Sequence, residues 1–187
     1  MRKIYDISHT NQMSWEEFDS IVKNLIEQVK DKKFDAIAPI LRSGSIPATI
    51  IANKLKITSF IPLQLKYAYP EQDITVKIPP TIPTDINSQD PLKILVVECN
   101  TSSGKAARKA YELLHSTFPN SELHYACVTK VSLGSNAPET LTGYQAYYVG
   151  RHTNELFLEP DRTDLRHGIT IYPWETAEYE LEDINHA

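Results

Sequence analysis

Two segments of the chain combine residue types that bind anions at the end of a strand. The first, ILVVECNTSSGKAARKA at 94–110, is an aliphatic run that reaches one acid, Glu98, and then a small polar turn closing on Gly104. An alanine-rich stretch typical of a helix follows, so the amides of the turn would lack partners within that helix. Such amides bind phosphate, and Ser102 and Ser103 add hydroxyl donors. The segment predicts an anion site, for which phosphate is the best fit; a plain capped helix after a strand is the alternative.

The second segment, LRSGSIPA at 41–48, is another strand-to-helix turn. Arg42 and the amides around Gly44 could bind a second anion there, although an isolated arginine is more often part of a surface ion pair. The carboxyl ends of parallel strands meet at one edge of a sheet, where α/β proteins bind their ligands. Two such turns therefore predict a ligand with phosphate groups at two places.

Other phosphate and nucleophile motifs fit the first segment poorly. A Walker loop needs Gly at position 99 and Ser or Thr after the lysine, where this chain has Cys99 and Ala106. Ser102 and Lys105 match S-x-x-K, but the partner motifs of that hydrolase class are absent from the sequence. Cys99 as a nucleophile would need an activating group, and the same turn contains no histidine. The six histidines show no metal-ligand spacing.

Length and composition limit the classes of protein. A chain of 187 residues fits a single domain, 1–187. The net charge of −5 argues against a broad nucleic-acid surface but leaves room for a local basic pocket. No apolar run approaches the roughly 20 residues that span a bilayer, and the first residues show no signal-peptide pattern. Two cysteines cannot build a disulfide framework, so we expect a cytoplasmic protein. From the charge and the apolar runs together, we expect neither nucleic-acid nor membrane partners.

Apolar periodicity predicts alternating helices and strands. A capping box of Ser14 and Glu17 opens the first helix. The expected helices are 15–29, 47–56 and 103–116, and the expected strands are 34–40, 58–67, 93–98, 122–131 and 145–150. This alternation indicates an α/β fold with a parallel five-stranded sheet flanked by helices. The proline-rich segment 68–91 shows no periodicity, which is typical of a functional or mobile loop. Two apolar pieces follow, LFLEP and GITIYPWE, and the acidic tail 175–183 reads as a solvated end.

Three segments, in order, resemble the type I phosphoribosyltransferases, closest to the bacterial xanthine-guanine and related purine branch. The first is Asp35 to Ala48, similar to the pyrophosphate loop of that family, and the second is ILVVECNTSSGKA, in the place of its signature motif. The third is YPWE, Tyr172 to Glu175, similar to the ending of the purine branch. The resemblance covers about Ser14 to Glu175.

The resemblance implies a fold, a reaction and a cofactor. The fold would be a parallel core with a small hood, built from the N-terminal end and about 150–187, and a loop at about 68–91 that closes over the site. Members transfer a phosphoribosyl group from 5-phosphoribosyl-1-pyrophosphate (PRPP) to a nitrogen base, here a purine, in nucleotide salvage. They use Mg²⁺, and dimers are frequent, so a homodimer is expected by resemblance only.

The resemblance also assigns roles to residues. Arg42 and Glu98 would be the catalytic pair, with Glu98 on a ribose hydroxyl. Mg²⁺ would be carried by PRPP, and Glu98 is the one protein side chain that could contact it. The remaining expected substrate contacts are Ser43 and Gly44 for pyrophosphate, Cys99 beside Glu98, Thr101, Ser102, Ser103, Gly104 and Lys105 for the 5-phosphate, and Lys130 and Tyr148 for the base.

Three positions depart from the family pattern. Cys99 stands for the second acid, Ala106 for the closing threonine, and Ile169 for an aromatic residue near the tail. A thiol hardly accepts hydrogen bonds, and losing a charge-assisted bond costs about 1.5–3 kcal/mol. The sequence therefore leaves two functions open on this fold: a divergent transferase, or a sensor that binds a phosphoribosyl compound or nucleotide without turnover. An unrelated phosphate-binding α/β protein is a third reading.

Overall fold

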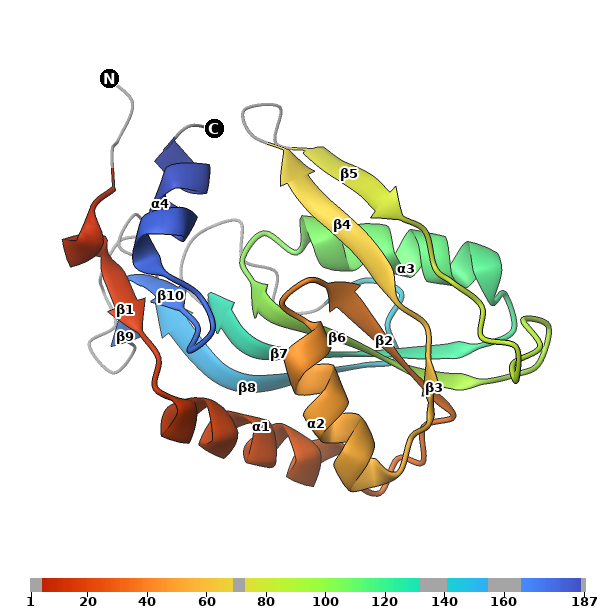
Figure 1. The fold of residues 1–187 in the computed structure, drawn as a ribbon. Coiled ribbons are helices and arrows are strands. Elements are labelled where there is room, and N and C mark those ends of the chain that lie inside the picture. The colour runs from red at the N-terminus through yellow and green to blue at the C-terminus, as the bar shows by residue number, and fades with distance from the viewer. Residues whose placement is uncertain (1–4, 69–72, 132–140, 155–165, 186–187) are drawn as a thin grey trace.

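A twisted sheet forms the centre of the computed structural model, which describes residues 5–68, 73–131, 141–154 and 166–185 (Figure 1). Its core is five parallel strands, which confirms the predicted α/β class. In spatial order these strands are β4 (Leu63–Ala68), β2 (Ala36–Leu41), β6 (Lys93–Thr101), β7 (Glu122–Val131) and β8 (Ala146–Asn154). Short β9 (Arg166–His167) extends the β8 edge in parallel, and β5 (Asp73–Ile78) extends the β4 edge antiparallel.

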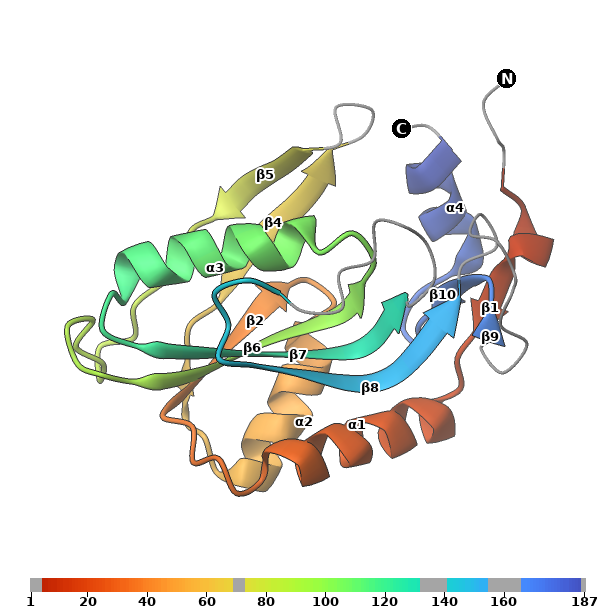
Figure 2. The same cartoon turned by 180° about the vertical axis from the view of Figure 1, so that it is seen from behind.

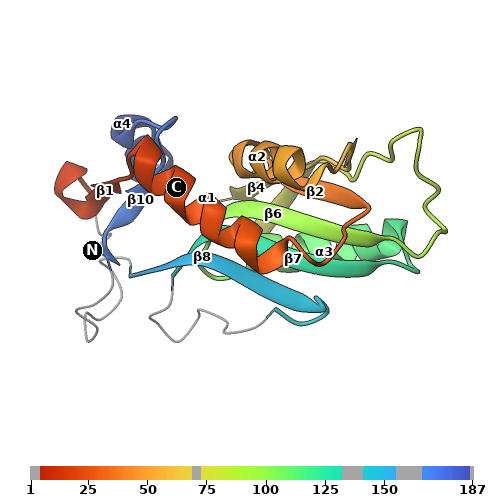
Figure 3. The same ribbon diagram turned by 90° about the horizontal axis from the view of Figure 1, so that it is seen from below.

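Helices cover both faces of the sheet, as expected for parallel strands (Figure 3). The side chains of β6 alternate between the two faces: Leu95 and Val97 pack with α1 (Trp15–Val29) and α2 (Ser45–Leu55), whereas Ile94 and Val96 pack with α3 (Lys105–Thr117). All four are fully buried. The middle of the strand is therefore buried on both sides; Lys93 lies at its start, and its other polar residues, from Glu98 on, lie at its carboxyl end.

The expected helices and strands are present; α1 and β7 have the predicted bounds, and the ends of the others are shifted. The capping box of α1 is formed, since the Glu17 amide donates to Ser14 Oγ at 3.2 Å and the Ser14 amide donates to Glu17 Oε2 at 3.1 Å. The strand expected at 58–67 is divided into β3 (Ser59–Phe60) and β4. Pro62 lies at the break, and a proline has no N–H to continue the ladder to β2.

The sequence did not predict β5 or α4 (Ala177–Asn185), nor the short elements η1 (Ile7–His9), β1 (Thr10–Gln12) and β9. Residues 73–78 form β5, which pairs antiparallel with β4 inside the segment expected to be a loop; Figure 2 shows the two strands side by side next to α3. The expectation of a solvated acidic end is wrong, because α4 follows a short turn and buries Leu181. The apolar piece at 156–160 lies outside the described residues.

The two ends of the described chain meet in a small subregion above the carboxyl edge of the sheet (Figure 1). Here β1 (Thr10–Gln12) pairs in parallel with β10 (Ile169–Ile171), preceded by the 3-10 turn η1 (Ile7–His9). Tyr5 and Asn185 exchange hydrogen bonds of 2.9 and 2.8 Å and so tie α4 to this subregion. We call this unit, residues 5–12 and 169–185, the hood. Among the described helices, none combines the length and apolar character required to cross a membrane.

Candidate functional site

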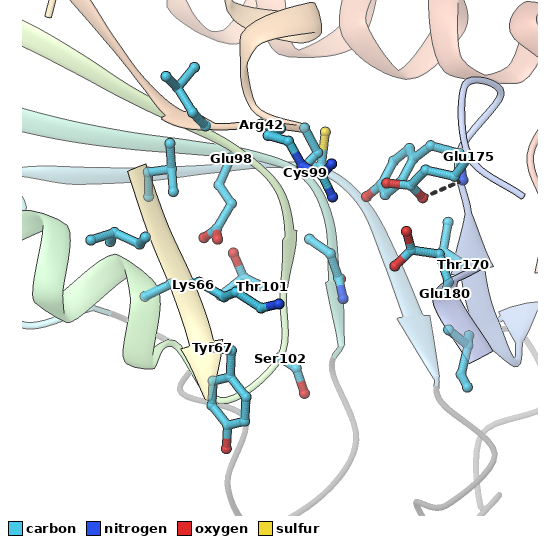
Figure 4. A pocket seen from close by; sticks show the side chains of 18 of the residues that line it. Arg42, Lys66, Tyr67, Glu98, Cys99, Thr101, Ser102, Thr170, Glu175 and Glu180 are labelled. Carbon is cyan, nitrogen blue, oxygen red and sulfur yellow. Dashed lines mark hydrogen bonds between the residues drawn. The ribbon is translucent and has the colours of Figure 1, made fainter. Parts of the chain in front are cut away.

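A large pocket lies between the carboxyl edge of the sheet and the hood (Figure 4). Both predicted anion-binding turns open into it, together with Glu98 and the end of β4. The opposite wall comes from the hood. The hood residues that line the pocket are Tyr5, Ile169, Thr170, Tyr172, Trp174, Glu175, Thr176, Tyr179, Glu180 and Ile184. The structure therefore brings the two turns to one cavity, as the strand order of a parallel sheet predicts.

The β2–α2 turn is held tightly against the sheet by Gly44. A Cβ at this position would lie 2.5 Å from the carbonyl oxygens of both Ile40 and Val97, so only glycine fits. The Ser45 hydroxyl donates to the Arg42 carbonyl at 2.7 Å and fixes the turn further. Arg42 and Ser43 line the pocket, whereas Gly44 lies behind them against β2 and β6.

Arg42 links this turn to the hood. Its Nη2 donates to the Tyr179 hydroxyl at 3.4 Å, and its Cζ lies 5.9 Å from the centroid of the Tyr179 ring. The exposed Tyr179 belongs to α4. The acidic composition of 175–183 predicts a solvated end, so this contact across the pocket is not predictable from the sequence.

The β6–α3 turn contains the second predicted anion site. Gly104 is the N-cap of α3 with a φ of 72°, a left-handed conformation that glycine adopts without strain. The first helical bond runs from the Arg108 amide to the Gly104 carbonyl, so the amides of 104–107 have no acceptor within the helix. The Lys105 amide reaches Ser103 Oγ at 3.4 Å, and Arg108 Nη2 donates to the Ser103 carbonyl at 3.0 Å. Thr101, Ser102, Ser103, Gly104 and Lys105 all line the pocket. These features suit a phosphate group.

Glu98 stands between the two turns, on the floor of the pocket. It is partly buried, and it accepts a hydrogen bond from the hydroxyl of Tyr125 on β7. Burial raises the pKa of Glu98 to about 7, and the bond from Tyr125 limits this rise. Sequence reasoning missed Tyr125. It could have been found from the order of the strands. Because β6 and β7 are consecutive and pair in parallel, Tyr125 lies opposite Val96, close to Glu98.

Cys99 is among the residues around the pocket, but its side chain is buried in the core. It is 1% exposed and packs with the apolar cluster that includes Val97 and Ile51. Burial raises the pKa of its thiol well above the ordinary value, Glu175 adds to the rise, and a hydrogen bond with Ser43 opposes it. A thiol that stays protonated is a poor nucleophile, which argues against that alternative.

The hood places two carboxylates, Glu175 and Glu180, at the pocket. Glu175 Oε2 accepts a hydrogen bond of 3.0 Å from the Tyr172 amide, drawn dashed in Figure 4. Burial raises the pKa of Glu175 to about 7, with a further rise from Glu180 and an opposing effect of Arg42. Sequence reasoning used Glu175 only as the end of the YPWE motif, and no spacing in the chain indicates that it faces Arg42.

Two expected base contacts do not line the pocket. The 5% exposed Lys130, at the end of β7, has its Nζ 5.3 Å from the centroid of the Tyr147 ring. Tyr148 is buried near the amino end of β7, where its hydroxyl lies 2.9 Å from His124 Nδ1. Ile169 does line the pocket, and so does Trp174, which packs against Phe18 with ring centroids 4.8 Å apart.

The described residues contain no group of three or more His, Cys, Asp or Glu side chains arranged to hold a metal ion. Mg²⁺ is commonly bound by one or two carboxylates together with substrate phosphates and water. The Glu98 carboxylate lines the same pocket as both turns, so the donor set fits a Mg²⁺ that arrives on a phosphorylated ligand.

No family model matches the sequence. Among solved structures, a purine phosphoribosyltransferase from Pyrococcus horikoshii aligns over 90% of this chain and 95% of its own, with 20% identity and a TM-score of 0.67. The xanthine-guanine-hypoxanthine phosphoribosyltransferase of Helicobacter pylori aligns over 93% and 99%, with 17% identity and a TM-score of 0.62. A hypothetical protein from Neisseria gonorrhoeae with bound ppGpp aligns over 97% of both chains, with 16% identity and a TM-score of 0.64. The chain has the fold of the type I phosphoribosyltransferases, the family whose motifs its three segments resemble.

Proposed function

We propose that this protein transfers a phosphoribosyl group from PRPP to a nitrogen base of the purine class, as a divergent purine-salvage transferase. The observation that carries the proposal is the convergence of both anion-binding turns and Glu98 on one pocket. The purine class is supported by two structural neighbours described as a purine and as a xanthine-guanine-hypoxanthine phosphoribosyltransferase.

Different parts of the pocket would hold different parts of the ligand. Arg42 and Ser43 would hold the pyrophosphate, the 101–105 turn would hold the 5-phosphate, and Glu98 would accept hydrogen bonds from ribose hydroxyls. The bond from the anomeric carbon to the pyrophosphate oxygen breaks, and a bond to the base nitrogen forms. Negative charge grows on the departing pyrophosphate, so a fixed guanidinium there stabilises the transition state. When bound, Mg²⁺ would neutralise part of the same charge.

The protonation state of Glu98 sets a pH requirement for binding the sugar. Glu98 accepts two hydroxyl donors only as a carboxylate, and burial holds its pKa near 7. Binding of the sugar should therefore strengthen as the pH rises through 7. The hood wall, including Trp174 and Tyr172, would exclude water from the anomeric carbon.

A second candidate is a sensor on the same fold that binds a nucleotide or phosphoribosyl compound without turnover. Two observations favour it. The position of the second acid is taken by Cys99, which is buried in the core, and one structural neighbour was solved with ppGpp bound.

The test follows pyrophosphate release from PRPP with Mg²⁺ and a panel of purine bases. Release with one or more bases is expected, and Arg42→Ala should slow it by about 10- to 150-fold, the loss of one charged hydrogen bond. Arg151→Ala is the matched control, because Arg151 pairs with Glu17 at 3.6 Å and does not line the pocket. No release with any base, but a thermal shift on adding PRPP or nucleotide, would support the sensor. Neither release nor a shift would refute both candidates.

A further inference from the structure

A chain of buried hydroxyl groups runs beneath Glu98. Tyr125 on β7 is 0% exposed, and its hydroxyl donates to Glu98 Oε2. The same hydroxyl lies 2.9 Å from Thr101 Oγ1, in the turn expected to bind the 5-phosphate. Figure 4 shows the Glu98 carboxylate close to Thr101. One phenol therefore connects the carboxylate to the phosphate turn from below the pocket.

The direction of each bond follows from counting protons. A tyrosine hydroxyl has one proton. When Glu98 is ionised, Tyr125 gives that proton to the carboxylate and must accept from Thr101. The Thr101 hydroxyl proton then points to Tyr125, so this side chain does not donate to a phosphate. This revises the expectation that Thr101 binds the ligand through its hydroxyl.

We propose that Tyr125 is a positioning residue for Glu98. It holds Oε2 below the pocket floor and leaves Oε1 to accept hydrogen bonds from ligand hydroxyls. Thr101 completes the arrangement, since a hydroxyl that itself accepts a hydrogen bond donates more strongly. The identity of the ligand as a phosphorylated pentose rests on the proposed function, whereas the role of Tyr125 towards Glu98 does not.

Other groups around Glu98 are compatible with this role. Burial is the main influence on its pKa, and the bond from Tyr125 is the influence that favours the charged form. The titratable and charged side chains that face the same region are Cys127, Tyr144 and Tyr147 from the α3 side of the sheet, Cys99 on its own strand, and, in the pocket, Arg42, Lys66, Lys77, Lys105, Glu175 and Glu180. All are unchanged by removing the Tyr125 hydroxyl, which makes that single atom testable.

The direct test is a pH titration of the Glu98 carboxyl carbon by NMR in the ligand-free protein, with the resonance assigned by its loss in Glu98→Gln. Tyr125→Phe removes the bond that favours the charged form, so the midpoint should rise from about 7 by about one pH unit or more. Tyr144→Phe is the matched control: the partly buried Tyr144 packs in the same cluster, 5.1 Å ring to ring from Tyr125, but its hydroxyl donates to the Ala107 carbonyl at 2.8 Å. This control should leave the midpoint where it is.

Binding of ribose 5-phosphate and of inorganic pyrophosphate, measured separately by calorimetry at pH 7, extends the test to function. Tyr125→Phe should weaken ribose 5-phosphate binding by roughly tenfold or more and leave pyrophosphate binding unchanged. A merely structural role for Tyr125 would weaken both ligands alike and would not move the Glu98 midpoint.

The outcomes separate the two proposals. An unchanged Glu98 midpoint in Tyr125→Phe overturns the positioning role, whatever the ligands do. A raised midpoint in a protein that binds neither ribose 5-phosphate nor pyrophosphate supports the positioning role and overturns the proposed function. If Tyr125→Phe does not fold, Thr101→Val decides instead: it removes the donor to Tyr125 and should raise the midpoint by a smaller amount, and an unmoved midpoint overturns the role.

Discussion

Substitution of Cys99 tests whether the site differs in activity from the family pattern only because it lacks one negative charge. Cys99→Asp would place a carboxylate at a position that is 1% exposed, where Glu175 and Glu98 already disfavour negative charge. A buried charge without a partner is costly, so we expect the free energy of unfolding to fall by about 2–4 kcal/mol at pH 7.5. Pyrophosphate release should not increase. Urea denaturation and the release assay measure the two effects.

Cys99→Ser is the control for this substitution, because it changes the polarity of the side chain at nearly constant size and adds no charge. Its expected cost is about 1–3 kcal/mol, from burying a hydroxyl that is only partly hydrogen-bonded. A stable Cys99→Asp protein with faster pyrophosphate release would contradict the prediction and would show that the divergent motif lacks only its second acid.

At the same scale, the sequence predicted residues whose roles are local and missed those whose roles depend on a neighbour in space. Arg42 and Ser103 belong to turns that a short stretch of sequence specifies, and both line the pocket. Tyr125 and Glu175 reach the site from 27 and 133 residues beyond Glu98 and Arg42 along the chain, so no local pattern indicates them. Lys130 was placed by resemblance alone, and its side chain packs against Tyr147 instead of lining the pocket.

At the scale of elements, the β2–α2 turn is positioned by its contact with β6. Gly44→Ala would put a methyl group 2.5 Å from the Ile40 and Val97 carbonyl oxygens, which are fixed in strands. The turn must move away, and the expected cost is about 1–3 kcal/mol of stability. Because Arg42 moves with it, pyrophosphate should bind more weakly, which calorimetry measures.

Gly150→Ala is the matched control for Gly44→Ala. Its added methyl would lie 2.3 Å from Ile21 Cγ2 and 2.7 Å from the Val128 carbonyl oxygen, where α1 packs on β8. It should therefore destabilise the fold comparably without weakening pyrophosphate binding. Equal losses of pyrophosphate affinity in both variants would mean that the turn has no special role.

Elements with strong periodicity were predicted well, and weakly patterned ones were not. Helix α1 has a capping box and a regular apolar face, and its predicted range, 15–29, matches the observed helix. Strand β5 alternates only partly buried and exposed side chains, so its pairing with β4 and not its own sequence defines it. Helix α4 is acidic and buries Leu181. A tail of that composition resembles a solvated segment until its packing partners in the hood are known.

At the scale of the whole molecule, the pocket exists because the two ends of the described chain return to the same edge of the sheet. The rule for parallel sheets predicted the edge of the sheet at which the pocket lies. It could not predict the opposite wall, since β1 pairs with β10 across some 160 residues and Tyr5 bonds to Asn185 across 180. The resemblance supplied the idea of a hood, and the contacts of α4 with Arg42 give it a role at the site.

Two partly buried carboxylates, one on the floor of this pocket and one on its hood wall, give the whole fold a pH dependence. Glu98 and Glu175 have pKa values raised from 4.5 to about 7 in the folded protein. Between these pH values the folded protein binds more protons than the unfolded chain, so its stability falls as the pH rises. The contribution is fully present below about 4.5 and is lost as the pH passes through 7.

We therefore expect the free energy of unfolding, from urea denaturation without ligand, to be lower at pH 7.5 than at pH 5.5. Glu98→Gln and Glu175→Gln should each reduce this difference, because an amide does not titrate, and the double variant should reduce it most. The exposed Glu178 of α4 provides the control, since Glu178→Gln should keep the full difference. The same pH dependence in the double variant and the wild type would show that these carboxylates ionise freely, and that the pocket floor and hood are wetter than their packing indicates.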